Sequence, residues 1–158
     1  MVSTMEALKW PAHFPPTRKW ERFFIGVRWL GPDLSFFKAL RQLQSRRDAS
    51  SMTAWPDGEQ RDTAIAIGRA LQMIGWPTPY FLPDDSFNTA AYGPRFQSID
   101  GAGWEILTAV GDEIGRQVPP GFWRQCSVRD MSFGEVIAGL MLLPRGTGER
   151  RRRWRLWR

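Results

Sequence analysis

Between residues 62 and 140 the sequence contains three apolar runs with helical spacing, and each begins or ends at a residue type that favours a helix terminus. The first run follows Asp62, a possible N-cap, and stops at Gly75, and its apolar members are Ala64, Ile67, Leu71 and Ile74. The last run, from Ser132 to about Leu140, has Glu135 three positions after the serine, which is the capping-box pattern. No alternating run typical of strands accompanies them. These patterns predict a mostly α-helical fold without an extended sheet.

The middle run extends from about residue 101 to 114 and is followed by Gly115, the residue type most often found just after a helix. Its apolar stripe consists of Gly103, Leu107, Val110 and Ile114. Gly111 lies inside the run and costs roughly 1 kcal/mol relative to alanine. The middle helix is therefore predicted to be intrinsically weaker than the other two.

The sequence divides into four stretches. Residues 1–47 form a proline- and aromatic-rich N-terminal extension, with a helix predicted near 34–46 after a possible N-cap at Asp33. Small, polar, turn-forming residues occupy 48–60 and predict a linker. The three helices occupy 61–143, and an arginine-rich tail expected to be disordered occupies 144–158. The nine tryptophans are spread over the chain, which favours packing anchors over one aromatic site.

The formal charge of +6 is concentrated in one segment. Residues 145–158 hold seven arginines and one acid, so the remainder of the chain sums to zero. Within this tail, arginines alternate with two indoles that could stack on bases or enter a lipid headgroup layer. Either this segment contacts nucleic acid or an anionic membrane, or it is an extension that serves only solubility. The predicted polyanion-binding residues are Arg150, Arg151, Arg152, Arg153, Trp154, Arg155, Trp157 and Arg158.

Catalytic side chains are sparse. His13 is the only histidine and Cys126 the only cysteine, which argues against a metal site or a nucleophile–histidine pair. We expect Cys126 to be a small buried residue. Asp84 and Asp85 could serve as acid and base, but adjacent loop acids are more often solvated or cap a helix. The sequence predicts no enzymatic activity, no cofactor and no metal.

Compartment signals are equally plain. The first ten residues lack the apolar core of a secretory signal. The apolar stretch from Val136 to Leu143 is too short to span a bilayer. A single cysteine gives no sign of a disulfide framework. The expectation is a cytoplasmic protein.

The order of these elements resembles that of acyl carrier proteins over roughly 80 residues. In that family an acidic-Ser-Phe step precedes the second helix, and here Asp85-Ser86-Phe87 is similar. The second helix ends in acids, an apolar residue and glycine before a step into proline, as Asp112-Glu113-Ile114-Gly115 and Val118-Pro119 do. Ser127-Val128-Arg129-Asp130 is similar to the step before the last helix. The resemblance implies an acyl-carrier-like helical bundle, like that of uncharacterised bacterial carrier-like proteins.

In that family a serine at the start of the second helix carries phosphopantetheine, and two positions compete for it here. An ungapped count back from Gly115 places Asp100 at the attachment position, so the serine is absent. The local motif instead selects Ser98, which requires two extra helical residues and hence a rotation of about 200°. We favour the ungapped count, because that rotation would scramble the apolar face and because Gln97 stands where the family has an acid.

The resemblance implies a function in protein binding. Carrier domains present the second helix to partner proteins, and here that face and the 92–97 loop before it would include Tyr92, Arg95, Asp100, Trp104 and Glu105. The first hypothesis is therefore a non-catalytic carrier-like protein that binds another protein. One alternative is a working carrier with phosphopantetheine on Ser98. The other is a small nucleic-acid-binding accessory protein that uses the arginine–tryptophan tail.

Overall fold

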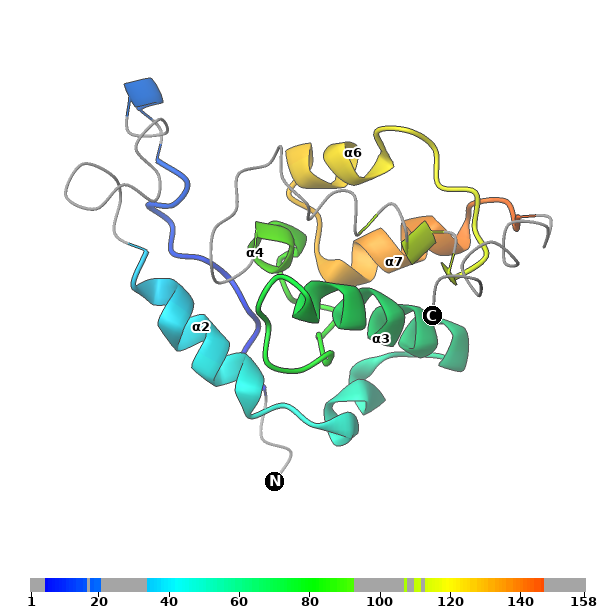
Figure 1. The fold of residues 1–158 in the computed structure, drawn as a ribbon, viewed down its shortest axis with the longest axis horizontal. Coiled ribbons are helices and arrows are strands. Elements are labelled where there is room, and N and C mark those ends of the chain that lie inside the picture. The colour runs from blue at the N-terminus through cyan, green and yellow to red at the C-terminus, as the bar shows by residue number, and fades with distance from the viewer. Residues whose placement is uncertain are drawn as a thin grey trace.

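The computed structural model describes residues 5–16, 18–20, 34–92, 107, 110, 111 and 113–146, and in these residues the chain is mostly α-helical, as predicted (Figure 1). The elements are α2 (Phe36–Ser45), the 3₁₀ helix η1 (Ala49–Ala54), α3 (Gly58–Gln72), α4 (Phe87–Tyr92), α6 (Phe122–Val128) and α7 (Phe133–Met141). The described residues contain two isolated antiparallel bridges, Ser86 with Ser132 and Arg116 with Arg145, and no strand. None of the described helices is long and apolar enough to cross a membrane.

Helices α3 and α7 pack against each other in the middle of the molecule, and α4 contacts α6 beside them (Figure 1). The apolar residues of α3 predicted to face inward, Ala64, Ile67 and Leu71, are buried. The core also includes Trp55, Trp76, Phe81, Phe87, Leu107, Val110, Trp123, Phe133, Val136, Ile137 and Leu140. Three of the five described tryptophans are therefore packing anchors.

Helix α3 begins one turn earlier than predicted. Asp57 is its N-cap, and the Asp57 carboxylate accepts a hydrogen bond from the backbone N–H of Gln60 at 2.7 Å. Asp62 lies exposed in the second turn of the helix. The prediction of Asp62 as the cap was wrong because Pro56-Asp57-Gly58 also has the composition of a turn, and an extended aspartate before a helix is the geometry that capping requires.

The start of α7 matches its prediction. The hydroxyl of Ser132 accepts a hydrogen bond from the Glu135 N–H at 3.2 Å, and the Glu135 carboxylate accepts one from the Ser132 N–H at 2.7 Å. Val136, Ile137 and Leu140 are buried, as expected. The capping box thus fixes both the first residue of the helix and the face that it turns inward.

The described part of the middle helix supports the predicted stripe. Leu107 and Val110 are helical and buried, and Gly115 has the positive φ (69°) of a residue that follows a helix. Close packing explains the glycine at position 111, because a Cβ there would stand 2.6 Å from a methyl carbon of Val118. The remaining positions, 101–106, 108, 109 and 112, lie outside the described residues.

Two boundaries differ from the sequence prediction. Residues 48–60 are not a linker, because they hold η1 and the first turn of α3, and Met52 and Trp55 are each only 2% exposed. Residues 144–146 are joined to the body rather than belonging to a loose tail. Pro144 O accepts from the Gln117 N–H, and the Gly146 N–H donates to Gly115 O, both at 2.9 Å.

Two short helices were not predicted. Helix α4 follows Ser86, whose hydroxyl accepts from the Thr89 N–H at 3.2 Å. Helix α6 follows Gly121, which adopts a left-handed conformation (φ 83°) that favours glycine. Runs of six and seven residues cover too few turns to show a helical period in the sequence.

Candidate functional site

Most residues predicted to act in binding lie outside the described part of the chain. These are Arg95, Ser98, Asp100, Trp104, Glu105, Arg150, Arg151, Arg152, Arg153, Trp154, Arg155, Trp157 and Arg158. Tyr92 is described. It ends α4, is half-buried, and its ring centroid lies 5.4 Å from that of Trp10. The backbone N–H of Trp10 also donates to the Thr89 hydroxyl at 3.1 Å. The N-terminal segment, by which we mean the described residues 5–16 and 18–20, thus covers part of α4 and contacts Tyr92.

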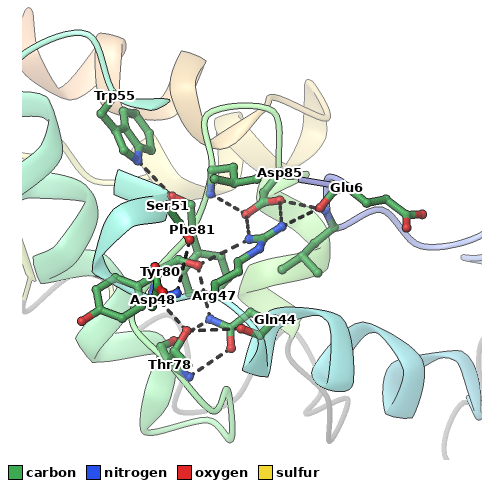
Figure 2. A network of polar contacts seen from close by, with 12 residues as sticks. Glu6, Gln44, Arg47, Asp48, Ser51, Trp55, Thr78, Tyr80, Phe81 and Asp85 are labelled. Atoms are coloured by element: carbon green, nitrogen blue, oxygen red, sulfur yellow. Dashed lines mark hydrogen bonds and ion pairs between the residues drawn. The ribbon is translucent and has the colours of Figure 1, made fainter. Parts of the chain in front are cut away.

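The most concentrated polar constellation in the described residues is a buried ion pair between Arg47 and Asp85 (Figure 2). Two guanidinium nitrogens of Arg47 donate to the two carboxylate oxygens of Asp85, at 2.6 and 2.9 Å. The backbone N–H groups of Leu8 and Leu82 each donate to one of these oxygens at 2.7 Å. The carboxylate therefore accepts four hydrogen bonds, in the bidentate geometry that makes arginine–carboxylate pairs strong.

The pair is inaccessible to solvent. The side chains of Arg47 and Asp85 are 3% and 0% exposed. A lone charge at such a depth costs several kcal/mol, so each partner depends on the other and on the additional hydrogen bonds. Asp84, by contrast, is exposed. The expectation of two solvated or capping loop acids is therefore wrong for Asp85, and the pair does not form an open acid–base site.

The ion pair joins three segments that are distant in sequence. The second terminal nitrogen of Arg47 also donates to Glu6 O at 2.8 Å, which fastens residues 6–8 to the end of α2. One turn earlier, the Gln44 side chain donates to Thr78 O at 2.6 Å and accepts from the Thr78 N–H at 3.0 Å (Figure 2). The Trp55 indole N–H donates to Phe81 O at 2.9 Å. The 78–85 segment is thus held by α2, by η1 and by the N-terminal segment.

Beside Asp85, two helices begin at adjacent points. The pattern Asp-x-Ser-Phe occurs at residues 84–87 and again at 130–133, and Ser86 and Ser132 form an antiparallel bridge. The Phe87 N–H donates to Met131 O at 3.1 Å, and the Phe133 N–H donates to Asp85 O at 2.7 Å. The first residues of α4 and α7 therefore hold each other in place, and this repeated pattern is the sequence signal that could have predicted α4.

Arg116 makes a second structural connection, at the far end of α7. Its guanidinium donates to Met141 O and Leu143 O at 3.0 and 2.9 Å. It also pairs with the half-exposed carboxylate of Glu59 at 2.5 Å. A cation at the last carbonyls of a helix is favourable because those groups lack partners within the helix. Arg116 thus joins the end of α7 to the start of α3.

The remaining reactive side chains of the described residues show no catalytic geometry. Cys126 is buried, as expected, and burial raises the pKa of its thiol to about 11, which disfavours the nucleophilic thiolate. His13 is exposed in the N-terminal segment. The described residues contain no group of three or more histidine, cysteine or acidic side chains that could hold a metal ion.

A search of known proteins finds no family model, no curated protein and no solved structure that matches this chain.

Proposed function

We propose that this chain is a non-catalytic, carrier-like protein that acts by binding a partner protein. The order of its helices supports the carrier-like arrangement: α3, then the helical residues 107, 110, 111 and 113, then α7 behind its capping box. The polar constellation at Asp85 supports a non-catalytic role, because its hydrogen bonds connect segments of the chain to one another.

The observation that carries the proposal concerns the only Asp-Ser step in the sequence, Asp85-Ser86. Asp85 is fully buried against Arg47, and Ser86 caps α4 while its backbone N–H donates to Leu8 O at 2.9 Å. An attachment serine must reach the active site of a modifying enzyme, whereas this serine is half-buried beneath the N-terminal segment. Under the proposal neither Ser86 nor Ser98 carries phosphopantetheine.

The first experiment asks whether the full chain is modified. We would co-express it with a phosphopantetheinyl transferase of broad specificity and measure its intact mass. The expected mass is that of the unmodified chain. A gain of one phosphopantetheine group that disappears in Ser98→Ala, but persists in Ser86→Ala, would establish the working carrier instead.

The second experiment tests the surface predicted to bind the partner. The tagged full chain, Trp104→Ala and Met73→Ala would be used to recover proteins from the source cells. Met73 is the control, because it is 76% exposed in the turn after α3. We expect one protein to be retained by the wild type and Met73→Ala and lost from Trp104→Ala. If all three chains retain the same proteins, this surface is not the binding site.

A further inference from the structure

We propose that the exposed face of α2 is a polyanion-binding surface that contacts the phosphate backbone of a nucleic acid. This inference does not depend on the carrier-like function and concerns a different surface from the predicted partner-binding face around Trp104. It rests on three exposed basic side chains: Lys38 and Arg41 lie on α2, and Arg46 is the C-cap residue that directly follows it. We refer to them as the α2 cationic face.

The α2 cationic face follows from the helical geometry. Lys38, Arg41 and Arg46 are all exposed, and at about 100° per residue they fall within an arc of roughly 140°. The opposite side of the helix carries the buried residues Phe37 and Gln44. Figure 1 shows α2 at the periphery of the molecule, apart from the packed pair α3 and α7. One side of α2 is therefore used for packing and the other faces solvent.

The charges on this face are not neutralised internally. Helix α2 contains no acidic residue, and none of the ion pairs in the described residues involves Lys38, Arg41 or Arg46. The charge of the neighbouring Arg47, in contrast, is paired with that of Asp85. A body with no net charge can present a locally positive surface where acids are few. Asp48, two residues after Arg46, is exposed, and its carboxylate accepts hydrogen bonds from the Ser50 N–H and hydroxyl. Other exposed acids lie further along the chain. Three of them, Asp57, Glu59 and Asp62, are exposed at the start of α3.

The face is held in a fixed orientation. Gln44 and Arg47, at the end of α2, are bonded to the 78–85 segment, and Phe37 packs edge-to-face on Phe14 with ring centroids 6.2 Å apart. Charges on a fixed helix lose less conformational freedom on binding than charges on a flexible segment. The α2 cationic face therefore needs little further ordering when it binds.

The residues between the charges favour phosphate as the ligand. Gln42 and Ser45 are exposed among the three basic residues, and lysine, arginine, serine and glutamine side chains are typical phosphate contacts. Insertion into a lipid surface requires an apolar face. Within α2, all of whose residues the structure describes, no large apolar side chain is exposed. Protein interfaces depend on buried aromatic and arginine anchors, and this exposed face lacks the aromatic ones.

The dimensions fit a duplex. From Lys38 to Arg46 the helix rises about 12 Å, a length over which duplex DNA presents about seven phosphates. Three simultaneous contacts are therefore geometrically accessible. Because each neutralised phosphate lowers the slope of log K against log salt by about 0.9, the face should contribute a slope of about −3.

The experiment measures this slope on the full chain. Fluorescence anisotropy would follow binding to a random-sequence DNA duplex over a range of salt concentrations. The test variant is Lys38→Gln/Arg41→Gln/Arg46→Gln. The control, Arg69→Gln/Arg124→Gln/Arg129→Gln, removes the same charge from exposed positions on α3, on α6 and directly after α6. The arginine tail is the same in both variants, so their difference reports the site.

We expect the slope of the test variant to be less negative than that of the wild type by about 3, and that of the control to change by less than about 1. Equal changes in the two variants would show that only net charge matters and would overturn the proposal, as would no change in either. Anionic lipid vesicles and polyglutamate serve as comparison ligands. If the test variant loses affinity for one of these and retains its affinity for DNA, the assignment to nucleic acid is wrong.

A second measurement uses the unmodified sequence, so it does not depend on the variants folding. Acetylation of lysines would be followed by mass spectrometry with and without saturating duplex. Lys9 and Lys19, which are exposed in the N-terminal segment, provide internal references. The proposal requires Lys38 to become several-fold less reactive relative to these references. Unchanged relative reactivity of Lys38 under saturating duplex contradicts it.

Discussion

The start of α7 and the Arg47–Asp85 pair show two different ways in which a side chain determines structure. Ser132 and Glu135 are three residues apart and exchange hydrogen bonds within one helical turn. Asp85 instead binds Arg47 across 38 residues and the Leu8 backbone across 77. The first arrangement is encoded locally and was predicted. The second exists only once the chain has folded, and its energy depends on exclusion of water.

The comparison teaches that polar residues of the same type can contribute very differently to the stability of the fold. Two adjacent aspartates differ completely, since Asp84 is exposed and Asp85 is fully buried. A cap exchanges water for a backbone donor at the surface and contributes about 1 kcal/mol. A buried ion pair stabilises only as a complete unit, and loss of one partner leaves the other charge without solvent.

The largest effect is expected for Asp85→Ala. This substitution leaves Arg47 buried without its counter-ion and should lower the free energy of unfolding by about 3–5 kcal/mol. Denaturant unfolding of the full chain measures the effect. Asp84→Ala is the matched control and should change stability by no more than about 0.5 kcal/mol. Similar losses at both positions would mean that the ion pair carries no special weight.

The next effect concerns close packing. A Cβ at Gly68 would stand 1.9 Å from the carbonyl oxygen of Pro79, so Gly68→Ala must push α3 away from the 77–81 segment. We expect a loss of about 1–3 kcal/mol, the usual cost of overpacking. Gly58 lies on the same helix, and a Cβ at this position would meet nothing within 4 Å. Thermal melts should therefore show an unchanged or slightly higher Tm for Gly58→Ala.

A smaller effect separates the two candidate caps of α3. Asp57→Ala should cost about 1 kcal/mol, because it removes the acceptor for the Gln60 N–H. Asp62→Ala should change stability by less than about 0.5 kcal/mol, because Asp62 lies on the exposed side of the helix. Helicity and unfolding free energy would be compared for both variants. A larger loss for Asp62→Ala would restore the cap predicted from sequence.

The smallest perturbation is chemical rather than mutational. Because burial raises the pKa of the Cys126 thiol to about 11, alkylation of the folded chain should be slow at pH 8 and should accelerate as the pH approaches that value. Alkylation in denaturant provides the reference rate at each pH. Equal rates for folded and unfolded chains at pH 8 would show that the region around α6 opens readily.

Sequence reasoning succeeded where the determining residues lie within a turn or two of each other. Gly115 and the Ser132–Glu135 box are such cases, and both are present in the structure. It failed at Asp57, because a proline–aspartate–glycine step is equally typical of a turn and of a helix start. It could not pair Arg47 with Asp85, because neither residue has a local pattern that identifies its partner.

Of the two candidate polyanion-binding surfaces, one could be predicted from the sequence and the other could not. The arginine tail was visible because its residues are consecutive, although most of it lies outside the described residues. The α2 cationic face was hidden by the neutral total charge of the body, even though Lys38, Arg41 and Arg46 are close in sequence. Its detection required knowledge that these three side chains are exposed and that no ion pair of the described residues involves them.

The hydrogen bond from the Leu8 N–H to Asp85 also has a consequence for biosynthesis. A ribosome that adds roughly 5–20 residues per second makes Asp85 about 4–15 seconds after Leu8. During that interval the Leu8 N–H has been synthesised, but the Asp85 carboxylate that accepts its hydrogen bond has not. Trp10 and Phe14, which pack on each other in the finished protein with ring centroids 5.0 Å apart, are synthesised before the α4 residues that Trp10 contacts. The docking of the N-terminal segment is consequently coupled to the speed of translation.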